Sequence, residues 1–383
     1  MTQYYLAKTI ILEDSEVDDA YLVVTDGVID GVVTEVPEGG EVIDYSNYIL
    51  APGLVDTHIH GYKNYDVMDA DPAGLQVMAE SLPSCGVTSW LPTTLTDSTE
   101  NLNKACRVIA EHYRELSGAK VQGIFLEGPY FTEKYQGAQN PKYMSDPSTE
   151  QLDEWLYLSE GLVNKIAIAP ERDGATEFIK HAGDKEVHVA LAHSDATFEE
   201  ATEAIKAGAK IFIHLYNGMS GLHHRNPGMV GAALASKETV FTEIIADGHH
   251  VHPGAIQVVK NARSAEEIVL VTDCMRAGGI GEGKSSLGEF PVYVKDGQAR
   301  MVKDDNLAGS ILELIDGVQN LVKWGIASVY DAVRMASLNP AKSVGIDDVC
   351  GKLAPDYAAD FIVIDEEVNL KATYINGEKH FSL

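Results

Sequence analysis

From Tyr48 onward, short apolar runs alternate with amphipathic helical stretches, and this alternation predicts the fold. Eight apolar runs end at polar or turn residues, near His60, Pro92, Glu127, Pro170, His193, Asn217, Asp247 and Asp273. Helical patterns separate most of them, for example Leu102–Leu116, Glu150–Leu158, Phe198–Ala207 and Ala255–Ala262. Strands and helices in this order predict an α/β protein built on a TIM (β/α)8 barrel.

The two ends of the chain have a different pattern, that of short strands joined by tight turns. Strand-like runs occur at Tyr4–Leu12, Ala20–Val24, Val28–Thr34, Asp360–Ile364 and Ala372–Ile375. Asp26-Gly27 and Asn376-Gly377 have hairpin turn chemistry, which indicates antiparallel pairing. We therefore expect residues 1–50 and 355–383 to form a small β-sandwich domain, with residues 51–354 as the barrel domain.

The segment after Asp273 departs from the strand and helix alternation. Phe290–Met301 predicts a hairpin that turns at Asp296-Gly297. Ile311–Trp324 and Ser328–Ala336 then have helical periodicity. We expect this segment to belong to the barrel domain.

Charge and composition narrow the possible partners. The chain has 383 residues, and 58 acidic against 29 basic residues give a formal net charge of -29. This excess opposes binding to nucleic acid and to anionic membranes. No apolar run approaches the roughly 20 residues of a membrane span. The N-terminus lacks the order of a signal peptide, and the four cysteines form no C-x-x-C pair, so we expect a cytoplasmic protein without disulfides.

Six residues with metal-ligating side chains fall at the ends of predicted barrel strands. His58 and His60 lie two residues apart on the first strand, so their side chains point the same way. The other four follow apolar runs on the third, fifth, sixth and eighth strands: Glu127, His193, His214 and Asp273. The carboxyl ends of barrel strands meet at one rim, so these residues predict a metal centre there. A buried hydrogen-bond network without metal is the alternative interpretation.

His188 is a further histidine on the predicted strand of His193. It lies five positions before His193 on the same predicted strand, so strict alternation predicts that it points to the opposite face. We assign it no role.

A metal centre of this composition favours hydrolysis of an amide or a cyclic amide. The metal activates water at neutral pH and polarises the carbonyl group under attack. A nearby carboxylate can take the proton from the water and pass it to the leaving amine. Asp273 is the candidate for this general base and acid, because it comes from the far, eighth strand and a carboxylate beside a cation prefers to be ionised, as a base must be.

The chain resembles the amidohydrolase superfamily and, within it, the N-acetylglucosamine-6-phosphate deacetylases. The resemblance covers nearly the whole chain, and its segments occur in the family's order: PGLVDTHIHG, LEGPYF, GAQNP, AHSDAT, HLYNGM, RNPG, IADGHHVHP, VTD and LAGS. The superfamily's opening motif alone is less specific than LEGPYF together with HLYNGM and ADGHHVHP. The resemblance implies hydrolysis of N-acetyl-D-glucosamine 6-phosphate to D-glucosamine 6-phosphate and acetate, in amino-sugar catabolism.

The resemblance also implies roles for the metal ligands. Glu127, His193 and His214 match the primary metal position, and His58 and His60 with Asp273 match a second position that only some members have. One or two divalent metal ions per subunit are therefore expected, first Zn or Fe, with Co, Mn or Ni as alternatives. Asp273 matches the general acid and base. No lysine matches the carboxylated lysine of other superfamily branches, whose place Glu127 takes.

Substrate contacts carry over in the same way. Gln139 stands where some members have a histidine that polarises the acetamide carbonyl, and Arg225 matches a phosphate contact, which its guanidinium suits. The other matched positions are Ala138, Asn217, Gly218, His250, Leu307, Ala308 and Gly309. The family implies a homodimer in which the neighbouring subunit helps to bind the phosphate.

Three other functions stay open on the sequence. The first is deacetylation of the galactosamine epimer. The second is hydrolysis of a cyclic amide or a dipeptide by another type of amidohydrolase. The third is a catalytically silent protein that binds metal and sugar phosphate, against which the complete ligand set and Asp273 argue.

Overall fold

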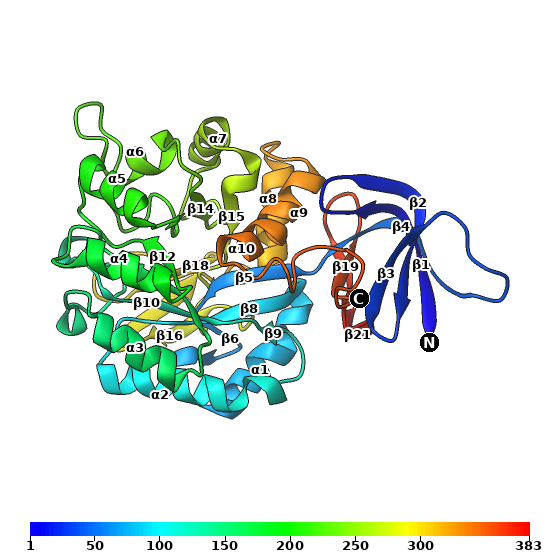
Figure 1. Cartoon of the computed structure of the whole chain (residues 1–383), viewed down its shortest axis with the longest axis horizontal. Helices are drawn as coiled ribbons and strands as arrows, with labels where there is room; N and C mark the ends of the chain where they lie inside the picture. Colours follow the sequence, from blue (N-terminus) through cyan, green and yellow to red (C-terminus); the bar gives the residue numbers. More distant parts are fainter.

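The computed structural model describes residues 1–383 and contains a barrel of eight parallel strands (Figure 1). The strands pair in chain order, and a parallel bridge between Ile59 and Cys274 joins the last strand region to the first. The predicted TIM barrel is confirmed. Its strands are β5 (Leu54–Ile59), β8 (Val87–Thr94), β10 (Ile124–Tyr130), β11 (Val163–Ile168), β12 (His188–Leu191), β13 (Ile211–Phe212), β14 (Phe241–Ile244) and β15 (Ile268–Leu270).

Helices surround the barrel, and the helices predicted from periodicity all occur with shifts of a few residues at their ends. The helices that follow successive barrel strands are α1 (Pro72–Ser81), α2 (Thr99–His112), α3 (Thr149–Leu158), α4 (Ala175–Asp184), α5 (Phe198–Ala207), α6 (Gly228–Ala235), α7 (Pro253–Ala262) and α8 (Leu314–Lys323). Two more complete the chain of helices, α9 (Val329–Met335) and α10 (Leu338–Ser343). None of these helices combines the length and the apolar character that a membrane-spanning helix requires.

Alternating side chains separate the inside of the barrel from the layer under the helices. On β11, Ile166 and Ile168 belong to the large core beneath the helices, whereas Ala167 belongs to a separate cluster inside the barrel. Val344 and Ile346, directly after α10, pack into this inner cluster. The sequence did not predict α10, which closes the end of the barrel opposite the ligand cluster.

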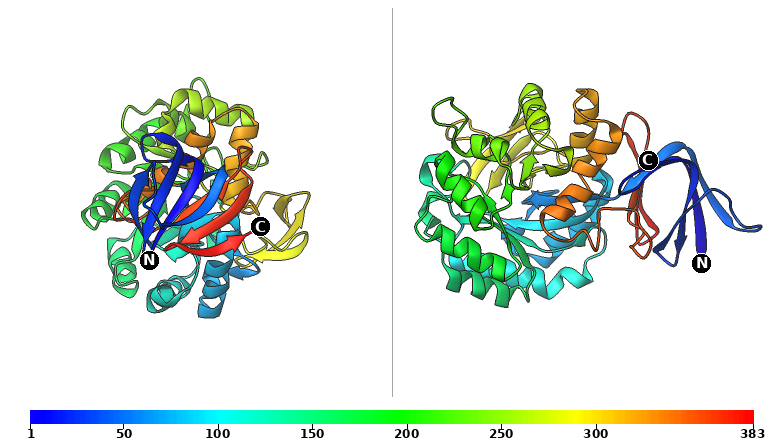
Figure 2. Two further views of the ribbon diagram at one scale, coloured as in Figure 1. Left: turned by 90° about the vertical axis from the view of Figure 1, so that its right-hand side faces the viewer. Right: turned by 45° about the horizontal axis from the view of Figure 1, so that its top comes forward.

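The N- and C-terminal segments form one seven-stranded sheet beside the barrel, in blue and red in Figures 1 and 2. It has its own core, in which Tyr5 packs edge-on against Phe361 and Tyr374. The pairing is mixed, because β1 runs parallel to β4. The strands, in sheet order, are β21 (Glu378–Ser382), β20 (Leu370–Ile375), β19 (Phe361–Ile364), β4 (Glu41–Pro52), β1 (Thr2–Ile11), β2 (Glu16–Thr25) and β3 (Val28–Val33).

The three predicted hairpin turns occur where the sequence placed them. Asp26, Asp296 and Asn376 each have a positive φ, as do the glycines that follow them. Two successive residues with positive φ are the mark of a type I′ turn, which matches the twist of the flanking strands.

A three-stranded sheet lies over the barrel rim, in yellow in Figure 2. It contains the predicted hairpin, β17 (Phe290–Lys295) and β18 (Gln298–Met301), and adds β16 (Gly283–Leu287). Its apolar side chains pack against Leu95 and Met275 at the rim. Shorter pieces are β6 (Gly61–Tyr62), β7 (Tyr65–Asp66), β9 (Lys120–Val121) and the 3-10 turns Val67–Asp69, Leu82–Cys85, Tyr113–Glu115, Glu133–Tyr135, Pro141–Tyr143 and Ala265–Glu267.

Two expectations about the strands are wrong. The sixth strand ends at Phe212 rather than near Asn217, because the chain turns at His214 and Tyr216, which have positive φ. His188 does not point away from the barrel interior. It pairs in register with Lys165, whose side chain lies inside the barrel, and its ring approaches Gly345 just after α10. His193 breaks the alternation instead, with a φ of 43°.

The contact between the two terminal hairpins gives a stability prediction. Gly27 has a φ of +83°, and a Cβ there would lie 2.5 Å from the carbonyl oxygen of Asn376. Gly39 has nearly the same φ, +84°, but nothing lies within 4 Å. Gly39→Ala should cost only the left-handed strain, about 1–2 kcal/mol. Gly27→Ala should cost about 1–3 kcal/mol more because of the clash.

Urea unfolding of the two variants checks this prediction. The midpoint should fall further for Gly27→Ala than for Gly39→Ala. Equal midpoints would show that the hairpin contact contributes nothing.

Candidate active site and metal centre

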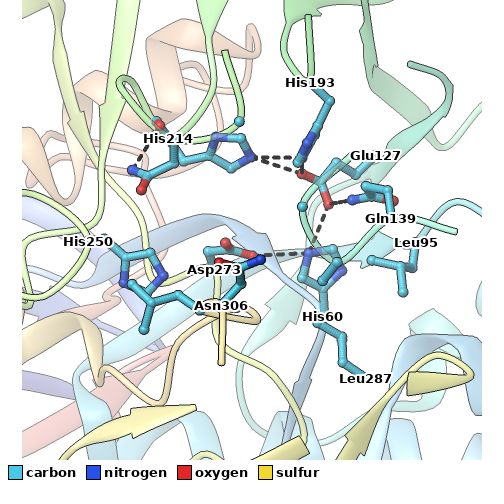
Figure 3. A pocket seen from close by; sticks show the side chains of 16 residues that line it. His60, Leu95, Glu127, Gln139, His193, His214, His250, Asp273, Leu287 and Asn306 are labelled. Atoms are coloured by element: carbon cyan, nitrogen blue, oxygen red, sulfur yellow. Dashed lines mark hydrogen bonds and ion pairs between the residues drawn. The ribbon is translucent and has the colours of Figure 1, made fainter. Parts of the chain in front are cut away.

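Five barrel strands bring the six predicted ligands together at one rim, and Figure 3 shows these ligands apart from His58. His58 and His60 come from the end of β5 and Glu127 from the middle of β10. His193, His214 and Asp273 lie two or three residues beyond the ends of β12, β13 and β15. All six side chains are buried or nearly so.

The three residues beyond the strand ends share an unusual backbone conformation. The φ angles of His193, His214 and Asp273 are 43°, 31° and 49°. Residues other than glycine rarely adopt a positive φ, because it strains the backbone. Backbone strain of this kind concentrates at functional sites. Here the left-handed residue ends the strand pairing and turns its own side chain toward the cluster.

Glu127 is the centre of the first group. Its Oε1 lies 3.3 Å from Nε2 of His193 and 3.2 Å from Nε2 of His214. These two histidine nitrogens are 3.2 Å apart. Three ligand atoms from three strands thus converge on one point.

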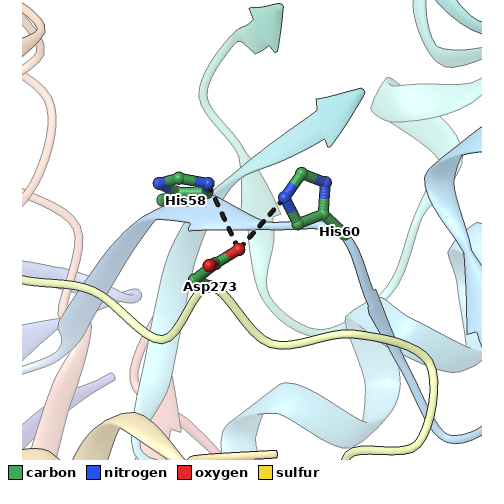
Figure 4. Close-up of side chains that lie close together, drawn as sticks. All are labelled: His58, His60 and Asp273. Carbon is green, nitrogen blue, oxygen red and sulfur yellow. Dashed lines mark ion pairs between the residues drawn. The ribbon is translucent and has the colours of Figure 1, made fainter. Parts of the chain in front are cut away.

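Asp273 joins the second group, which Figure 4 shows. Its Oδ1 lies 3.4 Å from Nε2 of His58 and 3.1 Å from Nε2 of His60. Oε2 of Glu127 is also 3.1 Å from Nε2 of His60. Glu127 therefore stands between the two groups and touches both.

Most of the cluster's histidines direct Nε2 into it because Nδ1 has a partner elsewhere. Nδ1 of His60 lies 3.2 Å from the carbonyl oxygen of Thr93, and Nδ1 of His193 lies 2.8 Å from that of Tyr135. A carbonyl oxygen only accepts, so each Nδ1 carries a hydrogen, and each ring in its neutral form offers the lone pair of Nε2 to a cation. Nδ1 of His214 has no partner.

The donor set fits divalent metal ions. The ligand atoms of His58, His60 and Asp273 lie within 4.8 Å of one another, and so do those of Glu127, His193 and His214. Nε2 of His58 is buried without a hydrogen-bond partner, which is costly unless a cation takes its lone pair. Imidazole and carboxylate ligands suit Zn and the neighbouring first-row metals.

The charged groups of the cluster shift one another's pKa. Burial alone would raise the pKa of Glu127, but His58, His193 and His214 together hold it well below its usual range. Burial also opposes ionisation of Asp273, yet His58 and His60 lower its pKa. Both carboxylates are therefore ionised at neutral pH. Against the opposing effect of burial, Asp273 and Glu127 raise the pKa of His58 to about 9, and a bound cation would displace that proton.

A cavity of about 260 Å³ opens above the cluster. His250 projects into it, held by a 2.6 Å contact between its Nδ1 and Oδ2 of Asp247. The cavity is lined by 16 residues: His60, Leu95, Glu127, Gly137, Ala138, Gln139, His193, His214, Asn217, Gly218, His250, Asp273, Leu287, Asn306, Leu307 and Gly309.

Gln139 is fixed in one orientation at the cavity wall. Its Oε1 accepts from the backbone N–H of Thr96 at 2.8 Å, so its amide group faces Glu127. Nε2 of Gln139 donates to Oε2 of Glu127 at 2.6 Å. In this arrangement Gln139 first of all orients Glu127.

Most predicted site residues line the cavity, but three do not. His58 lies fully buried beneath it, and Ala308 packs in the apolar cluster under the three-stranded sheet. Arg225 is exposed on the loop before α6, where its guanidinium contacts His224. Sequence reasoning missed four lining residues: Leu95, Gly137, Leu287 and Asn306.

Two buried charges below the cluster, Lys165 and Glu243, were not predicted from the sequence either. A signal was present, because each is the one charged residue of a barrel strand whose other residues are uncharged. Leu95 and Leu287 have no such signal, since apolar residues are expected at both positions.

The comparison with known families agrees with this geometry. The model of the Amidohydrolase family matches residues 49–380, which is most of the chain. The chain belongs to the amidohydrolase family. Membership confirms the predicted class, a metal-dependent amide hydrolase.

Curated relatives within the family are similar over most of their length. N-acetylglucosamine-6-phosphate deacetylase of Vibrio furnissii is 40% identical over 333 residues, 87% of this chain and 83% of the relative. N-acetylgalactosamine-6-phosphate deacetylase of Escherichia coli O157:H7 is 38% identical over 379 residues, 99% of both chains.

Solved structures of the family have the same architecture. A mutant N-acetyl-D-glucosamine-6-phosphate deacetylase from Mycobacterium smegmatis, in complex with N-acetyl-D-glucosamine-6-phosphate, matches with a TM-score of 0.93 at 28% identity, over 100% of this chain and 99% of that one. The N-acetylglucosamine-6-phosphate deacetylase from Thermotoga maritima matches with a TM-score of 0.89 at 32% identity, over 100% of both chains.

Metal binding should stabilise the fold in a way that depends on Glu127. Returning Zn²⁺ to chelator-treated protein at 100 times its dissociation constant should add about 2.7 kcal/mol to the free energy of unfolding. Glu127→Gln should abolish this gain because it removes the carboxylate shared by both groups. Thermal unfolding with and without the metal measures the effect.

His188→Gln is the matched control, because His188 is a histidine inside the same barrel but at the opposite end. It should keep the full metal-dependent gain. A loss equal to that of Glu127→Gln would show that the gain does not report on the cluster.

Proposed function

We propose that the chain hydrolyses N-acetyl-D-glucosamine 6-phosphate to D-glucosamine 6-phosphate and acetate. The observation that carries the proposal is the convergence of Glu127, His193, His214, His60 and Asp273 on one small cavity. The names and high coverage of the relatives supply the substrate. Measuring acetate released from this substrate by metal-loaded protein tests the proposal, which fails if no acetate appears.

The proposed metal site is held by Glu127, His193 and His214, with His58, His60 and Asp273 as a second position. A divalent ion bound there would supply Lewis-acid chemistry to the attacking water and to the acetamide carbonyl. Zn or Fe is our first expectation, and one or two ions per subunit are compatible with the ligand set.

Asp273 is proposed to move the proton. Its carboxylate lines the cavity and is ionised, so it can accept a proton from the attacking water. The carboxyl group of Asp273 can then pass that proton to the leaving amine of the sugar. The backbone of Asp273 donates to the carbonyl oxygen of His58 at 2.8 Å, which fixes the carboxylate beside the ligands.

The remaining lining residues are proposed to bind the sugar. His250, Asn217 and Asn306 offer polar groups to hydroxyls, and Gly218, Ala138, Leu307 and Gly309 leave room for the ring. Ala308 supports the loop from below. Gln139 already donates to Glu127, so we assign it the orientation of Glu127 rather than polarisation of the acetamide carbonyl.

We propose that Arg225 binds the phosphate in a homodimer. It is exposed and does not line the cavity of its own chain, which fits a contribution to a neighbouring subunit's site. A cytoplasmic location fits the four cysteines, all free and buried.

Asp273→Asn should separate proton transfer from metal binding. The amide keeps the shape and one oxygen, but it cannot accept a proton at neutral pH. We expect kcat to fall about 10²- to 10⁴-fold. Elemental analysis should find the metal at the Glu127 position retained, and unchanged turnover would remove Asp273 from the mechanism.

Arg225→Ala should raise KM selectively for phosphorylated substrate. Loss of a charged hydrogen bond of about 1.5–3 kcal/mol corresponds to a KM increase of about 10- to 100-fold. Steady-state kinetics on N-acetylglucosamine with and without the 6-phosphate provide the comparison, and the galactosamine epimer is the second substrate to assay. An equal effect on the unphosphorylated sugar would contradict the phosphate role.

A further inference from the structure

A lysine and a glutamate form an ion pair inside the barrel, directly beneath the ligand cluster. Lys165 of β11 and Glu243 of β14 are both fully buried and contact each other through Nζ and Oε1. Nζ of Lys165 also donates to the carbonyl oxygen of Thr57 at 3.2 Å and lies 3.9 Å from the centre of the Phe125 ring. Neither residue lines the cavity. An ion pair buried this deeply is rarely favourable for stability alone, which suggests a functional reason for it.

The free oxygen of Glu243 contacts a proposed metal ligand. Its Oε2 lies 3.0 Å from Nδ1 of His58. His60 and His193 place Nδ1 against backbone carbonyl oxygens instead, and Nδ1 of His214 has no partner. His58 is thus the one histidine of the cluster whose Nδ1 contacts an ionisable side chain.

Hydrogen-bond chemistry says what this contact does. A neutral histidine that gives Nε2 to a cation carries its hydrogen on Nδ1 and needs an acceptor there. Glu243 is that acceptor for His58. Lys165 has only donors to offer, so it occupies Oε1 and leaves Oε2 to face the ring.

We propose that Glu243, held by Lys165, is the positioning residue for a second metal ion at His58, His60 and Asp273. The position at Glu127, His193 and His214 does not depend on the pair. This inference rests on the proposed metal-dependent function and goes beyond it, because it makes occupancy of the second position depend on two side chains outside the cavity.

Glu243→Gln tests the proposal with almost no change of shape. An amide has one accepting side and one donating side. Lys165 can only donate, so it should take the amide oxygen and turn the NH2 group toward Nδ1 of His58. When Nε2 of His58 binds a metal, Nδ1 carries the hydrogen. Two donors, this N–H and the amide NH2 group, then face each other. Affinity for the second ion should fall about 10- to 100-fold, while the first ion binds as before.

The measurement is equilibrium dialysis of chelator-treated protein against Co²⁺, with elemental analysis of the bound metal. Unsubstituted protein should bind two Co²⁺ per chain. Glu243→Gln should bind one with the original affinity and the second more weakly. Two ions bound with unchanged affinity, or a single ion in the unsubstituted protein, would overturn the proposal.

Adding Lys165→Met to Glu243→Gln should restore the second ion. Without the lysine the amide can rotate, and its oxygen can accept from Nδ1 of His58. If Lys165 and Glu243 only filled space, the double variant should bind the second ion no better than Glu243→Gln, because Lys165→Met removes another buried contact. No recovery in the double variant would contradict the proposed positioning.

A second pair of variants covers the case in which Glu243→Gln alone does not fold. Lys165→Met with Glu243→Gln is compared with Lys165→Met with Glu243→Leu, since neither pair leaves a buried charge. Only the first offers an acceptor to His58, so only it should bind two Co²⁺. Acetate release by unsubstituted protein is measured separately, so that failure of the deacetylase proposal and failure of this inference are distinguishable.

Discussion

The contacts of the Glu127 carboxylate are the constraint on which the site depends. One oxygen faces His193 and His214, and the other faces His60 and Gln139. Because these partners come from four different parts of the barrel rim, the position of one side chain fixes the relative position of all of them. The central place of Glu127 on a continuous seven-residue strand gives it a rigid base, whereas its histidine partners after β12 and β13 lie on turns.

The balance of buried charge explains why this rim suits cations. Glu127, Asp273 and Glu243 bring three carboxylates together, and Lys165 compensates one of them. Ionised groups removed from water need partners of opposite charge. The histidines provide such partners only while protonated, so a divalent ion is the natural replacement. The suitability of the rim for cations comes from this local arrangement of charged side chains and not from the net charge of the chain.

The sequence predicts the barrel, a small β domain built from the two termini, and six converging ligands, because strand periodicity and the residues at strand ends can be recognised in the sequence. It cannot predict where strand pairing stops. The left-handed turns at His193 and His214 depend on contacts from distant segments, such as the carbonyl oxygen of Tyr135 on Nδ1 of His193. The same break of alternation explains the wrong expectation for His188. Leu287 was missed because only the folded three-stranded sheet brings it to the cavity, and Leu95, directly after β8, because an apolar residue at a strand end gives no signal of a site.

The site thus combines two kinds of support. Below the rim, paired strands and the Lys165–Glu243 pair hold His58 from inside the barrel. Above it, strained turns present His193, His214 and Asp273. Strained residues persist only where their surroundings leave no alternative. A bound cation would add to that constraint by linking turns to strands, so metal binding and the left-handed backbone at these three residues should stabilise each other.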